Sequence, residues 1–212
     1  MAELIDIYTD EGKNVGVACR KVAHRFALRH KTVHCWLTRG KNIIFQKRSS
    51  SLNDNPGKLY TTASGHLSAG ETVEDAFRRE TVEEFGLQVT NGVKLYEGKW
   101  DGDFKCEDGT DFLDRVFWTC FYAEIDVPLD ALKPQAAELD GLVEVDMNET
   151  LDLFHERVDV INGRGYLLED GKFVLKNIEV RREDFVCHLP DTLPNKFGKV
   201  IEWVLERMKD EG

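Results

Sequence analysis

The alternation of hydrophobic and polar residues along the chain predicts short β-strands arranged around a few helices. Apolar runs predict two hairpins and six further strands, at 3–19, 32–38, 42–47, 59–63, 93–100, 112–125, 142–145 and 164–176. Helical spacing of apolar residues predicts helices at 72–85, 148–156 and 196–208. Strands scattered in this way favour a mixed α/β (α+β) fold over a regular series of βαβ units.

The predicted helix at 72–85 carries an unusual arrangement of acidic residues. The segment contains no Gly or Pro, and Gly86 follows it as a stop signal. At about 100° per residue, Glu80 and Glu84 fall on the apolar face of the helix and Glu83 lies beside that face. Placing carboxylates on a buried helix face costs free energy unless a cation neutralises them. Mg²⁺ prefers carboxylate oxygens as ligands. From this geometry alone, a solvated acidic face remains an equal alternative.

Composition supports one soluble globular domain spanning residues 1–212. The chain is 42% hydrophobic and 32% charged, with 17 Gly and 5 Pro, a balance that excludes disordered and collagen-like proteins. We expect a core at about 30–160, an N-terminal hairpin at 3–19, and a C-terminal hairpin and helix within 161–212.

Charge and cysteine content restrict the partners and the compartment. The formal net charge of -11 argues against nucleic acid as a partner, and phosphorylated ligands would need a cation to approach. The sequence has no apolar run long enough to span a bilayer and no recognisable signal peptide. The five cysteines are an odd count without a CxxC pair, which is typical of reduced thiols in a cytoplasmic protein.

The segment GHLSAGETVEDAFRRETVEEFGL resembles the Nudix box, G-x5-E-x7-R-E-U-x-E-E-x-G-U, where U is a bulky aliphatic residue. All seven fixed residues match, and the final U position is Leu87. The one departure is Thr81 at the first U position. This position contributes to packing rather than to the chemistry.

This resemblance implies a fold with a mixed β-sheet sandwiched between helices, and a catalytic set on the box. In the family, the glutamates that match Glu80, Glu83 and Glu84 bind divalent metal. The residues that match Glu71 and Arg79 support that geometry, and Arg79 can hold Glu71 in a bidentate pair. The resemblance also indicates the backbone carbonyl of Ser64 as a group that faces the metal.

Residues 3–125 are similar to the branch of the family that contains type I isopentenyl-diphosphate isomerases and their hydrolase-like relatives. The run VHCWLTRGKNIIFQKRSSSLNDNPGKLYTTASGHLSAGE carries this similarity. Three histidines match the metal-binding histidines of the isomerases, and two aspartates lie near the position of their carboxylate ligands: His24, His30, His66, Asp111 and Asp114. Such a set suits Mn²⁺ or Zn²⁺. The alternative is that the histidines are surface residues or hydrogen-bonded loop residues.

Three features of the sequence favour a hydrolase over an isomerase. The isomerases use a cysteine where this chain has Ser64, and a serine hydroxyl is a poor acid or base near neutral pH. They also carry a basic, pyrophosphate-binding residue where this chain has Leu52, although the matching Arg48 is retained as a candidate for binding the substrate's phosphates. The glutamates of the box, which the isomerases usually lose in part, are complete here.

The sequence therefore predicts a Mg²⁺-dependent Nudix pyrophosphohydrolase, with Mn²⁺ as the alternative metal. The expected substrate is a nucleotide-like or other small phosphorylated metabolite that contains a diphosphate linkage. The alternatives are an isopentenyl-diphosphate isomerase and a non-catalytic module that binds a phosphorylated ligand. We expect no nucleic-acid or membrane partner, and the sequence does not choose between a monomer and a homodimer.

Overall fold

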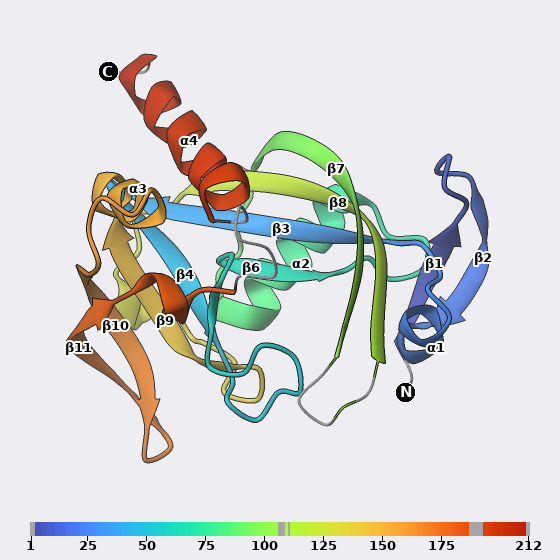
Figure 1. Ribbon diagram of the computed structural model, residues 1–212, viewed down its shortest axis with the longest axis horizontal. Coiled ribbons are helices and arrows are strands. Elements are labelled where there is room, and N and C mark those ends of the chain that lie inside the picture. Colours follow the sequence, from blue (N-terminus) through green and yellow to red (C-terminus); the bar gives the residue numbers. More distant parts are fainter. Residues whose placement is uncertain (1–2, 106–108, 110, 187–192, 211–212) are drawn as a thin grey trace. The chain divides into compact units, whose positions relative to one another are not determined.

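The computed structural model describes residues 3–105, 109, 111–186 and 193–210. Figure 1 follows the elements along the chain. The chain divides into two compact units: residues 1–36 with 61–124, and residues 37–60 with 125–212. The single domain predicted for 1–212 stays a prediction. No helix among the described residues is long and apolar enough to cross a membrane.

The first unit combines strands from three parts of the chain with two helices. Its elements are β1 (Leu4–Tyr8), β2 (Asn14–Cys19), α1 (Arg20–Arg25), the first part of β3 (His30–Arg39), β6 (Ala63–His66), α2 (Val73–Phe85), β7 (Val93–Lys105) and β8 (Asp111–Glu124). β1 and β2 form an antiparallel hairpin, β6 is antiparallel to β3, and β7 and β8 form a long antiparallel ribbon.

Local signals at both ends determine the helix α2, which confirms the predicted helix. The side chain of Thr72 caps the N-terminus, where its Oγ1 accepts from the backbone N–H of Asp75 at 3.1 Å. Gly86, with φ of 65°, adopts the left-handed conformation that ends the helix. The apolar residues Ala76, Phe77 and Phe85 are buried, so this face packs into the unit.

The sheet of the first unit lies between α2 and α1. Neighbouring residues of a strand point to opposite faces. Gly65 on β6 faces Glu80 of α2, whereas the next residue, His66, contacts His24 of α1. This arrangement agrees with the predicted mixed sheet that is sandwiched between helices.

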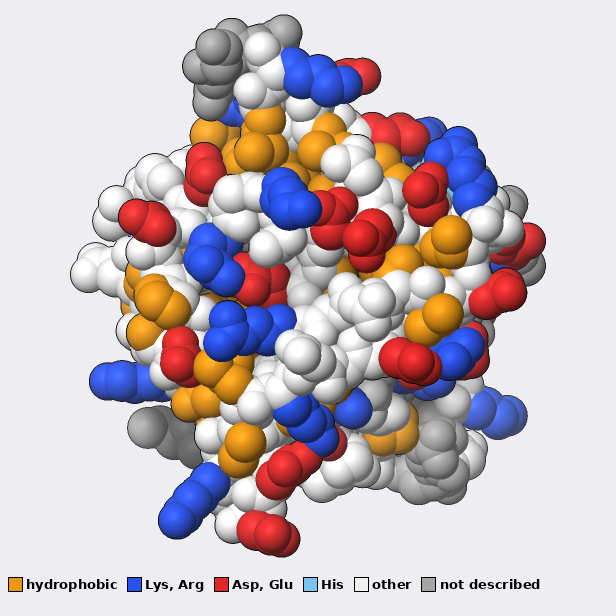
Figure 2. Space-filling model, turned by 90° about the vertical axis from the view of Figure 1, so that its left-hand side faces the viewer, with side chains coloured by type: hydrophobic (Ala, Val, Ile, Leu, Met, Phe, Trp, Pro, Cys, Tyr) orange, Lys and Arg blue, Asp and Glu red, His pale blue; other side chains and the backbone are white. Residues whose placement is uncertain are grey.

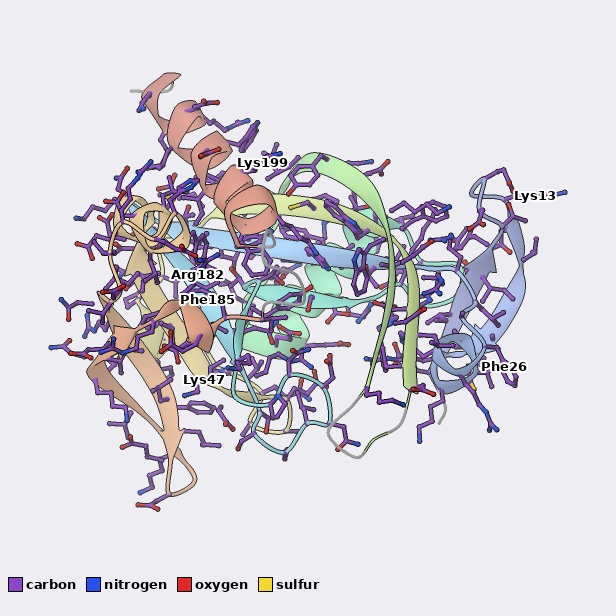
Figure 3. All side chains as sticks on the ribbon, in the orientation of Figure 1. Lys13, Phe26, Lys47, Arg182, Phe185 and Lys199 are labelled. Carbon is purple, nitrogen blue, oxygen red and sulfur yellow. The ribbon has the colours of Figure 1, made fainter. Side chains whose placement is uncertain are left out.

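The second unit contains an antiparallel sheet with its own aromatic core. Its elements are the last part of β3, β4 (Asn42–Arg48), β5 (Leu59–Tyr60), η1 (Leu129–Ala131), β9 (Leu139–Asp146), α3 (Met147–Phe154), β10 (Ile161–Glu169), β11 (Lys172–Val180), η2 (Arg182–Asp184), η3 (Leu193–Gly198) and α4 (Lys199–Asp210). β4, β9, β10 and β11 pair successively, each antiparallel to the next. Phe185, which is labelled in Figure 3, is buried. Its ring packs edge-on against those of Phe45 and Phe154.

Several predicted boundaries were wrong, mostly where pairing partners are distant in sequence. The expected strand at 59–63 is two short strands, β5 and β6, and β6 extends into the expected loop because it pairs with β3. β7 continues to Lys105, well into the connection expected after it, whereas β8 begins at Asp111, one residue before the expected start. The terminal helix starts at Lys199 after a π-helical turn, η3. A short helix, α1, forms within the basic stretch 20–31.

One face of the molecule carries charged side chains of both signs. On the face shown in Figure 2, Lys and Arg side chains are interspersed with Asp and Glu side chains. Charges of mixed sign at the surface favour solubility and give little long-range attraction for a polyanion.

Candidate functional site

The α2 helix buries two of its carboxylates. Glu80 and Glu84 are buried together with the apolar residues of the helix, whereas Glu83 is exposed. This confirms that acidic residues continue the apolar face. Burial raises the pKa of the neighbouring Cys35 thiol well above its usual value, and the negative charges of Glu84 and Glu80 add to the shift. The surroundings of these carboxylates therefore favour a cation.

Arg79 is the cation that holds these acidic residues in the structure. Its Nε and Nη2 donate to the two oxygens of Glu71 at 2.8 and 2.9 Å, which is the predicted bidentate pair. Its Nη1 donates to Glu80 at 2.7 Å and to Glu83 at 3.0 Å. The hydrogen bond with Glu71 is the main reason that the pKa of Arg79 is raised.

Arg79 and Glu71 also fix the loop that leads into α2. Nη2 of Arg79 donates to the backbone carbonyl of His66 at 2.8 Å, and Glu71 Oε2 accepts from the backbone N–H of Ser68 at 2.8 Å. The end of β6, the loop and the helix are thereby joined through one guanidinium group. A planar group with five donors can make all of these bonds at once.

Thr81, the departure from the box pattern, is fully buried in α2. Its hydroxyl donates to the backbone carbonyl of Arg78 at 3.0 Å, so the polar atom is satisfied within the helix. The methyl group is left to fill the packing position where a larger aliphatic residue is typical.

A second group of side chains gathers three histidines from three elements of the first unit. His24 comes from α1, His30 from β3 and His66 from β6. One ring nitrogen from each lies within 4.8 Å of the others, and Nε2 of His24 is 3.0 Å from Nε2 of His66. Among the described residues, no other three side chains with His, Cys or carboxylate ligand atoms are gathered this closely. His24 and His30 are buried, so these two are not surface residues, whereas the metal role of the trio stays a prediction.

Asp114, rather than Asp111, joins the histidines. Its Oδ1 lies 3.5 Å from His24 Nδ1 and 3.5 Å from His30 Nε2. Asp111 instead forms an ion pair with Lys105 at 2.6 Å. Three imidazoles and one carboxylate form a donor set that suits a transition metal or Zn²⁺.

The hydrogen bond of His30 determines which of its ring nitrogens can bind a metal. His30 Nδ1 lies 2.9 Å from the backbone carbonyl of Leu28, which makes Nδ1 the protonated nitrogen and leaves a lone pair on Nε2. In the part of the chain that the structure describes, neither His30 Nε2 nor His24 Nδ1 has a hydrogen-bond partner. A bound metal would satisfy these buried atoms.

Burial keeps the histidines neutral. It lowers the pKa of His24 to about 3 and the pKa of His66 well below its usual value, and it also lowers the pKa of His30. The positive charge of Arg20 adds to all three shifts. Neutral imidazole is the form that binds metal.

Arg20 is a site residue that the sequence reasoning missed. It is the first residue of α1 and precedes His24 by four positions, which places the two side chains on one helix face. Its Nη1 lies 3.2 Å from Glu3. The i, i+4 spacing of a cation and a candidate ligand was the signal that could have found it.

Two further candidates, Arg48 and Ser64, have clear positions, but their roles stay predictions. Arg48, in the second unit, donates from Nε and Nη2 to the backbone carbonyl of Asp54 at 3.0 and 2.8 Å, and so holds the polar loop after β4. Ser64, on β6, is opposite His34 of β3. His34 itself is buried, as its alternation with apolar residues predicts.

Comparisons with known proteins show the family to which the chain belongs. A family profile described as NUDIX domain matches residues 28–161, well over half of the chain. An uncharacterized Nudix hydrolase of Clostridium acetobutylicum is 27% identical over 192 residues, which cover 88% of this chain and 91% of that protein. The isopentenyl-diphosphate Delta-isomerase of Corynebacterium diphtheriae is 28% identical over 155 residues. These residues cover 72% of this chain and 84% of that protein.

The fold has a counterpart among solved structures. The crystal structure of DR0079 from Deinococcus radiodurans has a TM-score of 0.54 and 20% sequence identity, and the match covers 73% of this chain and 90% of that one. At this identity the likeness concerns the fold.

Proposed function

Because the chain belongs to the NUDIX domain family, a family of hydrolases that act on pyrophosphate bonds, we propose that it uses Mg²⁺ to cleave the diphosphate linkage of a small phosphorylated metabolite with water. The observation that carries this proposal is the pair of buried carboxylates, Glu80 and Glu84, beside the clamp between Arg79 and Glu71. A module that only binds a ligand has no need of a complete set of metal ligands, two of which are buried at a cost in free energy.

The donor set of the box fits a hard cation. Glu80, Glu83 and Glu84 offer only carboxylate oxygens, which Mg²⁺ prefers, and they would hold the ion. A bound Mg²⁺ neutralises phosphate charge and lowers the pKa of water. Mn²⁺ has a similar preference for oxygen and is the alternative.

Arg79 has two tasks in this proposal. In the structure its Nη1 neutralises Glu80 and Glu83, while Nε and Nη2 hold Glu71. If a cation bound Glu80 and Glu83, the hydrogen bonds from Nη1 would no longer be needed to neutralise them. The bidentate pair with Glu71 would still orient the loop. The proton of the attacking water passes to one glutamate of the box or to a carboxylate of another loop.

We also propose a second metal site, for Mn²⁺ or Zn²⁺, at His24, His30, His66 and Asp114. The buried, neutral imidazoles and the two ring nitrogens without a hydrogen bond support it. His66 contributes to both sites: its ring belongs to the cluster, and its carbonyl accepts from Arg79.

Isopentenyl-diphosphate isomerisation is the second candidate function. The similarity to the isomerase of Corynebacterium diphtheriae and the histidine cluster favour it. Ser64 opposes it, because a serine hydroxyl without a dedicated base does not exchange protons with carbon near neutral pH.

A panel of diphosphate compounds that includes isopentenyl diphosphate, assayed with and without Mg²⁺, tests the proposal. We expect phosphate or phosphomonoester release that needs divalent metal, and a loss of at least roughly 10²-fold in kcat for Glu84→Gln. Glu74→Gln is the matched control, because Glu74 lies on the same helix but is exposed. A folded Glu84→Gln protein with full activity would contradict the metal role, and binding without turnover across the panel would contradict the hydrolase.

A further inference from the structure

The strand β6 connects the two proposed metal sites of the first unit through two consecutive residues. The ring of His66 belongs to the histidine cluster, where its Nε2 lies 3.0 Å from Nε2 of His24. The backbone carbonyl of the same residue accepts from Nη2 of Arg79 at 2.8 Å. The preceding residue, Gly65, lies against the carboxylate of Glu80, which a β-carbon would overlap. A displacement of β6 would therefore change both sites.

Arg79 connects the position of β6 to the acidic residues of the box. The guanidinium group that donates to the carbonyl of His66 also donates to Glu71 at 2.8 and 2.9 Å, to Glu80 at 2.7 Å and to Glu83 at 3.0 Å. Because this group is planar and rigid, a shift at one of its nitrogens changes the bonds at the others. The carbonyl of His66 is thus an anchor for carboxylates that we propose to hold Mg²⁺.

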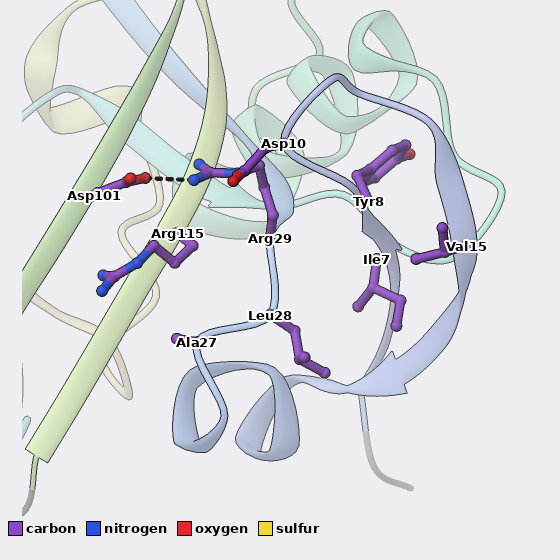
Figure 4. A pocket seen from close by; sticks show the side chains of 9 residues that line it. All are labelled: Ile7, Tyr8, Asp10, Val15, Ala27, Leu28, Arg29, Asp101 and Arg115. Carbon is purple, nitrogen blue, oxygen red and sulfur yellow. Dashed lines mark hydrogen bonds and ion pairs between the residues drawn. The ribbon is translucent and has the colours of Figure 1, made fainter.

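Two other ligands of the histidine cluster lie on strands that ion pairs connect independently of β6. His30 begins β3, and it follows Arg29, whose Nε and Nη2 donate to Asp10 and Asp101 at 2.6 Å each (Figure 4). Asp101 lies on β7, the partner of β8, which carries Asp114. Arg29 therefore holds the start of β3 to the β7–β8 ribbon, and with it the two ligands.

The position of β6 depends on fewer contacts between strands. The strand has four residues and pairs with β3 alone among the described strands. The ring of His66 meets the ring of His24 in a contact whose donor depends on the tautomer. In the described part of the chain, the buried Nε2 of His30 has no hydrogen-bond partner. An ion bound by His30, Asp114 and His66 would join β6 to the strands that Arg29 connects.

The donor set of the cluster favours a positioning role over contact with substrate. Three imidazoles and one carboxylate are four protein donors, the number that a structural Zn²⁺ site uses, whereas a catalytic Zn²⁺ keeps one position open. His30 is fully buried and His24 is 7% exposed. A metal enclosed in this way acts through the residues that it holds.

We propose that metal binding at the histidine cluster positions the box through His66, so that the two metal sites bind their ions with positive cooperativity. The ring of His66 receives the ion of the cluster, and its carbonyl holds Arg79 and the carboxylates paired with Arg79. This inference rests on the proposed function, because it requires a cation at the box. Thermodynamic linkage makes the effect reciprocal: each ion raises the affinity for the other by the same factor.

Calorimetric titration of the full chain with Mg²⁺, before and after loading with an equimolar amount of Zn²⁺, tests the cooperativity. Zn²⁺ prefers the imidazoles and Mg²⁺ the carboxylates. We expect the Zn²⁺-loaded protein to bind Mg²⁺ at least roughly fivefold more tightly, a typical coupling between two sites. Equal Mg²⁺ affinities would overturn the inference and leave the hydrolase proposal standing. If neither form bound Mg²⁺, the Mg²⁺ site of the proposed function would be contradicted, and the inference with it.

Two substitutions in the cluster locate the connection. His24→Ala and His66→Ala each remove one of the four ligands, but only His66 lies on β6. His66→Ala retains the backbone carbonyl that bonds Arg79. With Zn²⁺ at a concentration that saturates each variant, His24→Ala should retain the gain in Mg²⁺ affinity and His66→Ala should lose it. Any other pattern would overturn the role of β6.

Amide hydrogen exchange tests the same connection without Mg²⁺ and without activity. The backbone N–H of Ser68 donates to Glu71 at 2.8 Å, two residues after His66. Zn²⁺ loading should slow the exchange of this amide by roughly threefold or more, because it reduces local opening. The amide of Asn148, which donates to Asp146 in the second unit, is the control and should not change. An unchanged exchange rate at Ser68 would overturn the positioning role, whatever the outcome for hydrolysis.

Discussion

The carboxylate of Glu80 on α2 occupies the space that Gly65 on β6 leaves by having no side chain. A β-carbon at position 65 would overlap the Glu80 side chain. The glycine of the box is thus required by a close approach of a buried carboxylate to the strand, rather than by an unusual backbone conformation.

Gly65→Ala is therefore expected to displace Glu80. Overpacking of this kind costs about 1–3 kcal/mol, so the unfolding midpoint in urea should fall. The metal-dependent activity should fall as well, because Glu80 is a proposed ligand. Ser68→Ala is the control, since Ser68 is exposed and its backbone, not its side chain, bonds Glu71. Wild-type activity and stability in Gly65→Ala would show that the contact is not required.

Arg79→Lys tests the clamp on Glu71. The charge is retained, but a lysine has no planar fork to bond both oxygens of Glu71 together with Glu80 and the His66 carbonyl. We expect a loss of about 10-fold or more in kcat and a higher metal requirement. Arg78→Lys is the matched control, because the neighbouring Arg78 is exposed and pairs only with Asp75 among the described residues. An unchanged rate and metal dependence in Arg79→Lys would remove the positioning role.

His66→Ala tests the second metal site. Removing one of four ligands should lower the affinity for Mn²⁺ or Zn²⁺ by roughly 10-fold or more in calorimetric titration. Asp114→Asn should have a smaller effect of the same sign. His155→Ala is the control, because His155 lies in the second unit near Glu202 and belongs to no such cluster among the described residues. Equal affinities of the His66→Ala and wild-type proteins would contradict the site.

We predict that the protein does not convert isopentenyl diphosphate to dimethylallyl diphosphate. Ser64 replaces the required thiol, and Leu52 supplies no charge for the diphosphate. Incubation with Mg²⁺ and Mn²⁺ followed by chromatography measures the product. Product above that of a Glu84→Gln control would favour the isomerase instead. We also expect that Ser64→Cys alone gains no isomerase activity, because Leu52 remains.

Asp146 makes the stability of the second unit depend on pH. Its Oδ1 caps α3 by accepting from the backbone N–H groups of Asn148 and Glu149 at 2.8 and 3.2 Å, and Lys41 lies 2.9 Å from Oδ2. Burial acts to raise the pKa of Asp146, but Lys41 and the two N–H groups outweigh it and hold the pKa below its usual value.

The stabilisation by Asp146 is therefore fully present above about pH 4, the usual pKa of an unfolded aspartate, and is lost as the pH falls through the lower folded-state pKa. Asp146→Ala should lower the free energy of unfolding by about 1 kcal/mol at pH 7. The difference from the wild type should shrink at pH 2–3. Asp146→Asn keeps a capping oxygen and is the control. If the difference in unfolding free energy between Asp146→Ala and the wild type were the same at pH 7 and pH 2, the ionised carboxylate of Asp146 would not contribute to stability.

The box could be predicted from the sequence because its determinants are local. The Thr72 cap, the Gly86 stop and the helical spacing of the glutamates all lie within one short segment. Helical hydrogen bonds join residues four apart, so spacing along the chain fixes which side chains share a face. The match to the box, rather than helical spacing, predicted the pair between Arg79 and Glu71.

The histidine cluster and the ion pairs of Arg29 depended on tertiary structure. The sequence named His24, His30 and His66, but only the packing of α1, β3 and β6 brings their rings together, and only the course of β8 selects Asp114 over Asp111. Arg29 acquires its partners from β7 and from the turn between β1 and β2, Asp101 and Asp10. Strand pairing joins residues that are far apart in sequence, and a shift of one residue in register sends a side chain to the other face. Which polar side chains meet in the interior is therefore decided by register and packing, which no local pattern in this chain encodes.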